Sequence, residues 1–212
     1  MRTLVAWIAL AASVAASGTP LPECEIGDTF IYDNGRVEQF VSASSERLTW
    51  SAFEGRQYVR HRDFAIPLLE WETAESRGTR EVSPEAAGLW PLQPGKSVRF
   101  RVVTEVTREV KEGVNRHRRR AELWTCRVQP PAPITVPAGT FDALEIVCEE
   151  FSSTTMRLLS QEQWYYAEDV GHYISRRWYD LSTGRHGGYS LVMRLRGMEA
   201  NPPRIRSILS RL

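Results

Sequence analysis

Histidines and paired carboxylates are the side chains that most often carry out general acid–base chemistry, so they are the first candidates for a catalytic site. The chain contains four histidines, and His172 is the one in an aromatic setting, directly before Tyr173. Glu168 and Asp169 precede it, but adjacent residues on a strand point to opposite faces, which favours a polar turn over a carboxylate pair. The sequence therefore identifies no catalytic residue. A hydrolase site near His172 is the less favoured alternative.

Motifs that mark the common enzyme and cofactor classes are absent from the sequence. There is no nucleophile elbow, zinc-protease motif, phosphate-binding loop or dinucleotide-binding glycine pattern. No cysteine pair or neighbouring histidine has the spacing of a metal site. We therefore expect a protein that is not an enzyme and that holds no metal and no cofactor.

Aromatic residues are densest between residues 164 and 179. One interpretation is that they line an apolar ligand pocket inside a curved sheet. The alternative is that they fill a core, because aromatic side chains bury large areas and suit strands. The candidate pocket residues are Trp164, Tyr166, Tyr173 and Trp178.

A dense basic cluster runs from residue 116 to residue 120. On a strand its members point alternately to the two faces of the sheet. Two interpretations stay open: the cluster binds an anionic surface, or, as we favour, it pairs with glutamates of the preceding strand. The candidate anion-binding residues are Arg116, Arg118, Arg119 and Arg120, and the glutamates are Glu105, Glu109 and Glu112.

Two of the three cysteines lie on the apolar faces of expected strands. Cys126 lies between Trp124 and Val128 in a period-two pattern, and Cys148 follows Ile146 in another. In an oxidising compartment this placement predicts a Cys126–Cys148 disulfide, which would stabilise the fold by about 3 kcal/mol on the chain-entropy model. The alternative is a pair of buried free thiols.

The N-terminus has the layout of a cleaved secretory signal peptide over residues 1–17. Arg2 supplies a positive charge, residues 4–16 form an uncharged apolar run, and small residues follow. The run is too short for a membrane-spanning helix. Lipidation of Cys24 is a weaker alternative, because the position before it holds Glu23 rather than a small residue. We expect a periplasmic or secreted protein in which Cys24 has no assigned role.

The charge balance of the 212-residue chain excludes some partners. There are 27 basic and 26 acidic residues, and loss of Arg2 with the leader makes the two equal. A near-neutral exported chain is a poor partner for nucleic acid. Its length corresponds to one domain with a substantial core.

Hydrophobic alternation predicts a mostly β fold. Asn34-Gly35 between β-formers is typical of a tight hairpin, and about ten strands follow without a long helix between them. We expect one antiparallel β domain over residues 18–200, an open barrel or a curved sheet or sandwich, with residues 72–90 as a long loop. The expected strands include Thr29–Tyr32, Arg47–Ala52, Val98–Val110, Asn115–Val128, Phe141–Phe151, Tyr173–Tyr179 and Tyr189–Arg196.

The tail, residues 201–212, has the pattern of a short amphipathic helix. Asn201 is a natural N-cap, and Pro202 suits the first helical position. We expect the apolar face to pack on the sheet. The alternative is a basic element that contacts a membrane surface peripherally or a partner.

Two segments carry a resemblance to known proteins. The stretch from Ile134 to Ala143 contains VPAGTF, and Trp164-Tyr165-Tyr166-Ala167 is followed by Val170-Gly171. This pattern resembles that of uncharacterised bacterial secreted β proteins with domains of unknown function, over about residues 92–198. The chain departs from the pattern at Glu168, where such families commonly have a proline. The resemblance implies an envelope location and an antiparallel β fold, and it supplies no catalytic residue.

The sequence as a whole favours a non-enzymatic periplasmic or secreted β protein. Such a protein would bind a lipid or other hydrophobic ligand, another envelope-derived ligand, or an envelope protein. The alternative is a structural or assembly factor of the envelope.

Overall fold

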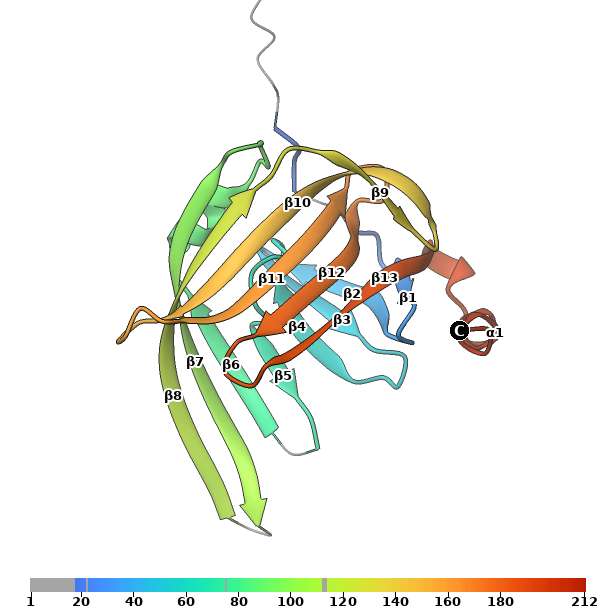
Figure 1. Ribbon diagram of the computed structural model, residues 1–212. Helices are drawn as coiled ribbons and strands as arrows, with labels where there is room; N and C mark the ends of the chain where they lie inside the picture. The colour runs from blue at the N-terminus through green and yellow to red at the C-terminus, as the bar shows by residue number, and fades with distance from the viewer. Residues whose placement is uncertain (1–17, 22, 75, 112–113) are drawn as a thin grey trace, which may run out of the picture.

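The protein forms a closed antiparallel β-barrel with one additional strand (Figure 1). The computed structural model describes residues 18–212 except residues 22, 75, 112 and 113. The expected signal peptide at residues 1–17 therefore lies outside the described residues. Twelve strands follow one another around the barrel, and pairing of β10 with β11 closes it, while β9 adds to the edge of β10. The mostly β, antiparallel class predicted from sequence is confirmed.

Most strands pair with their immediate neighbours in the sequence, so the barrel is built from successive hairpins. The strands are β1 (Thr29–Tyr32), β2 (Val37–Ser44), β3 (Arg47–Ser51), β4 (Gln57–His61), β5 (Glu70–Glu72), β6 (Ser76–Val82), β7 (Ser97–Lys111), β8 (Val114–Val128), β9 (Ala132–Val136), β10 (Gly139–Ser152), β11 (Leu158–Ala167), β12 (His172–Asp180) and β13 (Arg185–Leu195). The helical elements are η1 (Pro84–Leu89), η2 (Gly197–Glu199) and α1 (Pro202–Leu209).

The expectation of a long loop over residues 72–90 is wrong. Residues of β5 and β6 in this region form strands, and β6 pairs with β7 along its whole length. The sequence of β6 is polar and contains Gly78, which conceals a strand pattern. Gly78 is required there because the Trp71 ring lies across it, and an added Cβ would be 2.1 Å from that ring. The 3-10 helix η1 then begins directly after Ser83.

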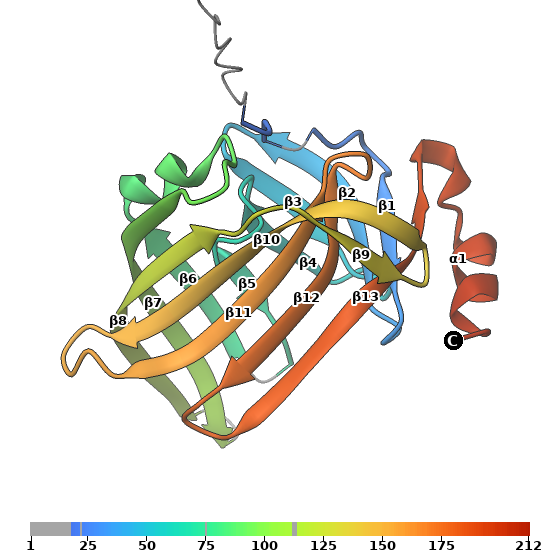
Figure 2. The same ribbon diagram turned by 45° about the horizontal axis from the view of Figure 1, so that its top comes forward.

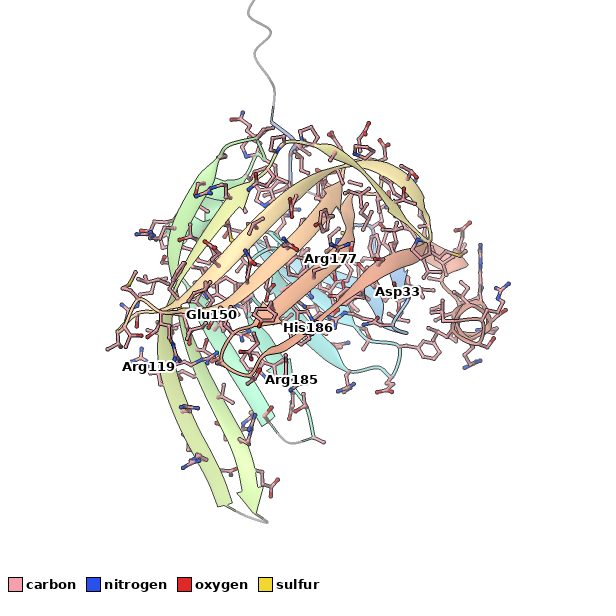
Figure 3. The ribbon with its side chains drawn as sticks, in the orientation of Figure 1. Asp33, Arg119, Glu150, Arg177, Arg185 and His186 are labelled. Carbon is pink, nitrogen blue, oxygen red and sulfur yellow. A yellow bond between two sulfur atoms is a disulfide. The ribbon has the colours of Figure 1, made fainter. Side chains whose placement is uncertain are left out.

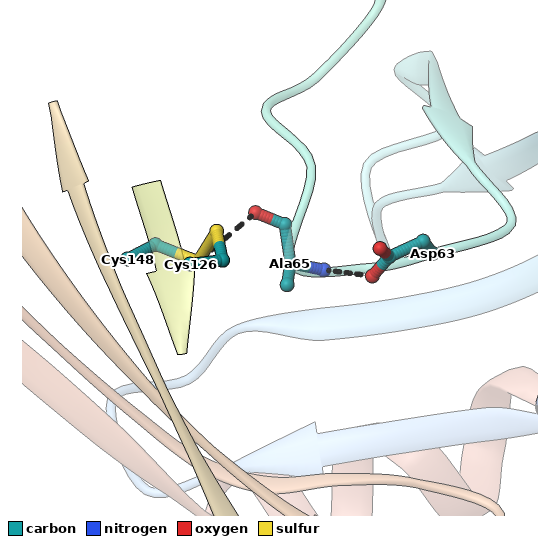
Figure 4. The surroundings of a disulfide bond; sticks show 4 residues. All are labelled: Asp63, Ala65, Cys126 and Cys148. Carbon is teal, nitrogen blue, oxygen red and sulfur yellow. Dashed lines mark hydrogen bonds between the residues drawn. A yellow bond between two sulfur atoms is a disulfide. The ribbon is translucent and has the colours of Figure 1, made fainter. Parts of the chain in front are cut away.

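One end of the barrel is filled by the connection between β4 and β5. Phe64, Ala65 and Ile66 in this connection are each at most 2% exposed and belong to the main apolar core. We refer to residues 62–69 as the plug. Beside the plug lies the Cys126–Cys148 disulfide, with Cys148 Sγ 4.0 Å from the carbonyl oxygen of Ala65 (Figure 4). The predicted disulfide is confirmed.

The short C-terminal helix packs on the outside of the barrel next to β1 and β13 (Figure 2). Its N-cap is as expected, because Asn201 Oδ1 accepts a hydrogen bond of 3.0 Å from the Arg204 amide. Ile205 and Ile208 of α1 pack against Ile31 and other apolar residues on the outer face. Within the described residues, no helix is long and apolar enough to cross a membrane.

Candidate functional site

The end of the barrel opposite the plug is hollow and lined by charge. A cavity of about 610 Å³ is bounded there by side chains from β8, β10, β11 and β12. We call this site the mouth. It is defined by Arg118, Arg120, Glu150, Glu162, Arg176 and Trp178. Figure 3 labels Glu150 at this end of the barrel, and Arg185 with His186 at the β12–β13 turn.

Strand register explains why the mouth begins directly beside the disulfide. Cys148 is opposite Cys126 on one side and opposite Glu162 on the other. Glu162 in turn is opposite Trp178, and Trp178 is opposite Gly187. Residues opposite each other in a ladder point to the same face. These cross-strand partners form one inward-facing row. Between β10 and its neighbour β11 the row changes from the apolar disulfide to the charged Glu162.

Trp178 gives the mouth an aromatic surface. Its ring lies across Gly187, where an added Cβ would be 2.8 Å from the ring. The glycine thus leaves room for the indole to pack flat on the backbone of β13. Trp178 remains partly exposed and lines the cavity.

Arg176 and Glu162 form the ion pair at the base of the mouth. Their Nη2 and Oε1 atoms are 2.9 Å apart, and the guanidinium lies 4.5 Å from the centre of the Trp164 ring. Burial alone lowers the pKa of Arg176, but the nearby Glu162 carboxylate raises it above its ordinary value. The Arg176 guanidinium therefore stays charged where the mouth meets the core.

A buried cluster around Glu38 separates the mouth from the filled end. Arg36 Nε and Arg60 Nη2 lie 2.7 and 3.3 Å from Glu38 Oε1, and the Tyr173 hydroxyl donates to Oε2 at 2.5 Å. Burial by itself raises the pKa of Glu38, but Arg60 and Arg36 hold it well below its ordinary value. A single buried carboxylate thus forms ion pairs with two arginines that point into the barrel.

Three of the four predicted pocket residues lie in the filled end. Trp164, Tyr166 and Tyr173 are at most 3% exposed, and the Phe64 ring lies 5.5–5.6 Å from each of their rings. Trp178 alone of the four lines the cavity. The space beside Trp164 is therefore occupied by the plug.

The residues of the alternative hydrolase site are not brought together. His172 is 2% exposed, its ring centre lies 4.2 Å from that of Phe30, and its Nε2 lies 3.4 Å from Glu38 Oε2. Its burial lowers its pKa. Glu168 and Asp169 are exposed in the turn between β11 and β12. Among the described residues, no group of three or more histidines, cysteines or carboxylates is placed to hold a metal ion.

The four arginines of the basic cluster are divided between the two faces of β8. Arg119 is on the outer face and pairs with Glu105 at 3.0 Å, as the favoured interpretation predicts. Arg120 is on the inner face and pairs with Glu122 and Glu150 instead. Arg116 and Arg118 share that inner face and form no ion pair with any described residue.

Several charged residues of the interior were not identified from the sequence, notably Glu38, Arg60, Glu162 and Arg176. Each is two residues from an inward aromatic side chain on its own strand, as Arg60 is from Tyr58 and Glu162 from Trp164. These residues could have been recognised from the sequence, because each continues the period-two pattern of inward-facing positions that an aromatic residue begins.

The fold and site together define a class: a twelve-stranded antiparallel barrel, plugged and disulfide-linked at one end and open with a charged lining at the other. No protein-family model matches the chain, and no curated protein matches it. Among solved structures the chain is similar to the hypothetical lipoprotein YmcC from Escherichia coli, with a TM-score of 0.50 and 11% identity over 78% of this chain and 82% of that one. This similarity concerns the fold.

Two further solved structures have lower similarity. One is an exported protein with a YmcC-like fold from Bacteroides fragilis, with 13% identity, a TM-score of 0.43, and coverage of 85% of this chain and 100% of that one. The other is a lipoprotein from Parabacteroides distasonis, with 10% identity, a TM-score of 0.37, and coverage of 84% and 100%. The sequence pattern VPAGTF … WYA … VG stays a prediction, because these similarities are of fold alone.

Proposed function

We propose that this protein is a non-enzymatic, exported barrel that binds a polar, envelope-derived ligand in its mouth. The observation that carries the proposal is the contrast between the two ends of the interior. Phe64 and its neighbours occupy the apolar end, while a cavity of about 610 Å³ remains at the charged end. Ligand sites are typically concave, with a few placed polar groups and aromatic walls.

The lining of the mouth selects for a polar ligand. A purely apolar molecule would remove water from Arg176 and Glu162 without replacing their hydrogen bonds, which is costly for charged groups. A molecule with hydroxyl or carboxylate groups can bond to these side chains and still pack on Trp178. The mouth therefore favours a polar envelope component over a lipid tail.

Two features support export. The leader at residues 1–17 has the layout of a signal peptide. The Cys126–Cys148 disulfide is typical of proteins that fold in an oxidising compartment. Both features suit a protein that meets its ligand in the cell envelope.

The proposal is tested by native mass spectrometry of the protein purified gently from bacterial envelope extract. We expect a bound mass on the wild type that is lost from Trp178→Ala. The matched control is Phe53→Ala, because Phe53 is an aromatic residue that is 37% exposed and does not line the mouth. A wild-type protein that is always ligand-free, or equal binding by both variants, would contradict the proposal.

A structural or assembly role is the second candidate, favoured by the filled apolar end. A barrel whose core is occupied by its own chain needs no ligand for stability. In that case in-cell crosslinking would capture the same protein partner with wild-type and Trp178→Ala chains. Ligand loss in Trp178→Ala without any change of partner would favour the binding role.

A further inference from the structure

The hairpin of β7 and β8 extends beyond the rest of the barrel, as Figure 1 shows. β8 pairs with β10 only from Glu122 to Val128. Its earlier residues pair with β7 alone. The inner face of this extension therefore continues from the mouth toward solvent.

Strand register places a row of arginines on that inner face. Glu122 is buried in the interior, so the residues at alternate positions before it point the same way. Arg108 of β7 is directly opposite Arg116 and therefore joins them. We call this set the inner arginine row, which consists of Arg108, Arg116, Arg118 and Arg120.

The arginines on the two faces of the hairpin differ in whether their charge is paired. On the outer face Arg119 pairs with Glu105. On the inner face Arg108 and Arg116 are opposed directly, an arrangement of like charges that destabilises a strand pair. Neither they nor Arg118 form an ion pair with any described residue. The hairpin thus carries a like-charge cost on its inner face that an external anion would relieve.

The row has a direction and a spacing. Alternate residues on a strand are about 7 Å apart, so the guanidinium groups form a series from the hairpin end into the mouth. Arg118 and Arg120 already line the cavity that contains Trp178. A ligand with anionic groups at intervals can engage several of these arginines at once, each with two parallel hydrogen bonds.

We propose that the inner arginine row binds a linear acidic saccharide whose carboxylates lie along the hairpin and whose terminal sugar packs on Trp178. This inference rests on the proposed function and names its ligand class. A flat membrane surface does not fit, because the row lies on the inward face while the outer face carries Glu105 and Glu109. The partly exposed indole supplies the flat apolar surface that suits a sugar ring.

The test is isothermal titration with tetragalacturonate. We expect wild-type binding that weakens as salt is raised, and at least a tenfold loss of affinity in the double variant Arg116→Gln/Arg118→Gln. The matched control is Arg99→Gln/Arg119→Gln, which removes the same charge from exposed residues of the outer face of the same hairpin and should change affinity less than twofold. The urea midpoint of the inner variant should be unchanged or raised, because like charges are relieved.

Each other outcome overturns the inference. Equal weakening by the inner and outer variants would show attraction by net charge alone. Equal binding of a neutral dextran tetramer, or of polyphosphate in place of the uronate, would exclude an acidic saccharide. If tetragalacturonate does not bind while native mass spectrometry still finds a ligand that depends on Trp178, the ligand class is wrong and the proposed function stands.

Discussion

The two ends of the barrel interior use similar aromatic residues for different purposes. At the plugged end, Trp164 and Tyr166 pack around Phe64, and their rings have almost no exposure. At the mouth, Trp178 packs on Gly187 and stays partly exposed among Arg176 and other charged residues. Aromatic density alone therefore does not mark a binding site. Whether an aromatic ring belongs to the core or to a binding site depends on how many apolar neighbours fill the space in front of the ring.

The difference also explains where buried charge is tolerated. Glu38 with Arg36 and Arg60 lies at the border between the ends, where each carboxylate oxygen has partners. A buried charge is stable only when paired and hydrogen-bonded. The cluster around Glu38 thus lies at the boundary between the apolar core and the charged lining of the mouth.

The largest expected effect comes from hollowing the filled end. Phe64→Ala should lower the free energy of unfolding by about 4 kcal/mol, because it removes a ring packed against several others and leaves a cavity. Trp178→Ala at the mouth should cost only about 1 kcal/mol, because its ring is partly exposed. Urea denaturation of both variants measures the two values. Equal losses would remove the distinction between the ends.

The next largest effect is expected from the buried cluster around Glu38. Glu38→Gln should lower the free energy of unfolding by about 3 kcal/mol, because it leaves Arg60 buried without a counter-charge. The control is Glu54→Gln. It removes an exposed ion pair with Arg56 and should lower the free energy of unfolding by about 0.5 kcal/mol or less. Chemical denaturation at neutral pH compares them. A loss for Glu38→Gln as small as that of the control would show that the arginines do not depend on this carboxylate.

The smallest effect is a pH dependence of the plug. Burial raises the pKa of Asp63 to about 6, while its carboxylate accepts a hydrogen bond from the Ala65 amide. The folded state therefore holds this proton more tightly than the unfolded state, so the stability it contributes is present below about pH 4 and lost as pH rises through 6. Asp63→Asn should remove about 2 kcal/mol of this dependence.

The measurement is the difference in unfolding free energy between the wild type and Asp63→Asn at pH 4 and pH 7.5. The comparison of slopes cancels the contributions of all other titrating groups. Parallel pH profiles for the two proteins would exclude Asp63 as the source.

Much of the fold followed from local pattern. The Asn34-Gly35 turn, the alternation along β7 and β8, and the capped C-terminal helix were each recognisable because they depend on neighbouring residues. The disulfide was also predictable, since both cysteines lay on apolar faces of strands joined by one connection. Strand β6 was missed because its residues are polar and its Gly78 is explained only by a tryptophan on the adjacent strand.

The sequence by itself determined which residues share a face, and the tertiary structure decided which face is inside and what lies across from it. A period of two separates Arg118 from Arg119 but cannot say which of them points into the barrel. Nor can it say that Phe64 enters the space beside Trp164, since 100 residues separate them in the chain. Closure of the barrel settled both points, because it fixes the direction of every strand face and limits the volume that side chains can fill.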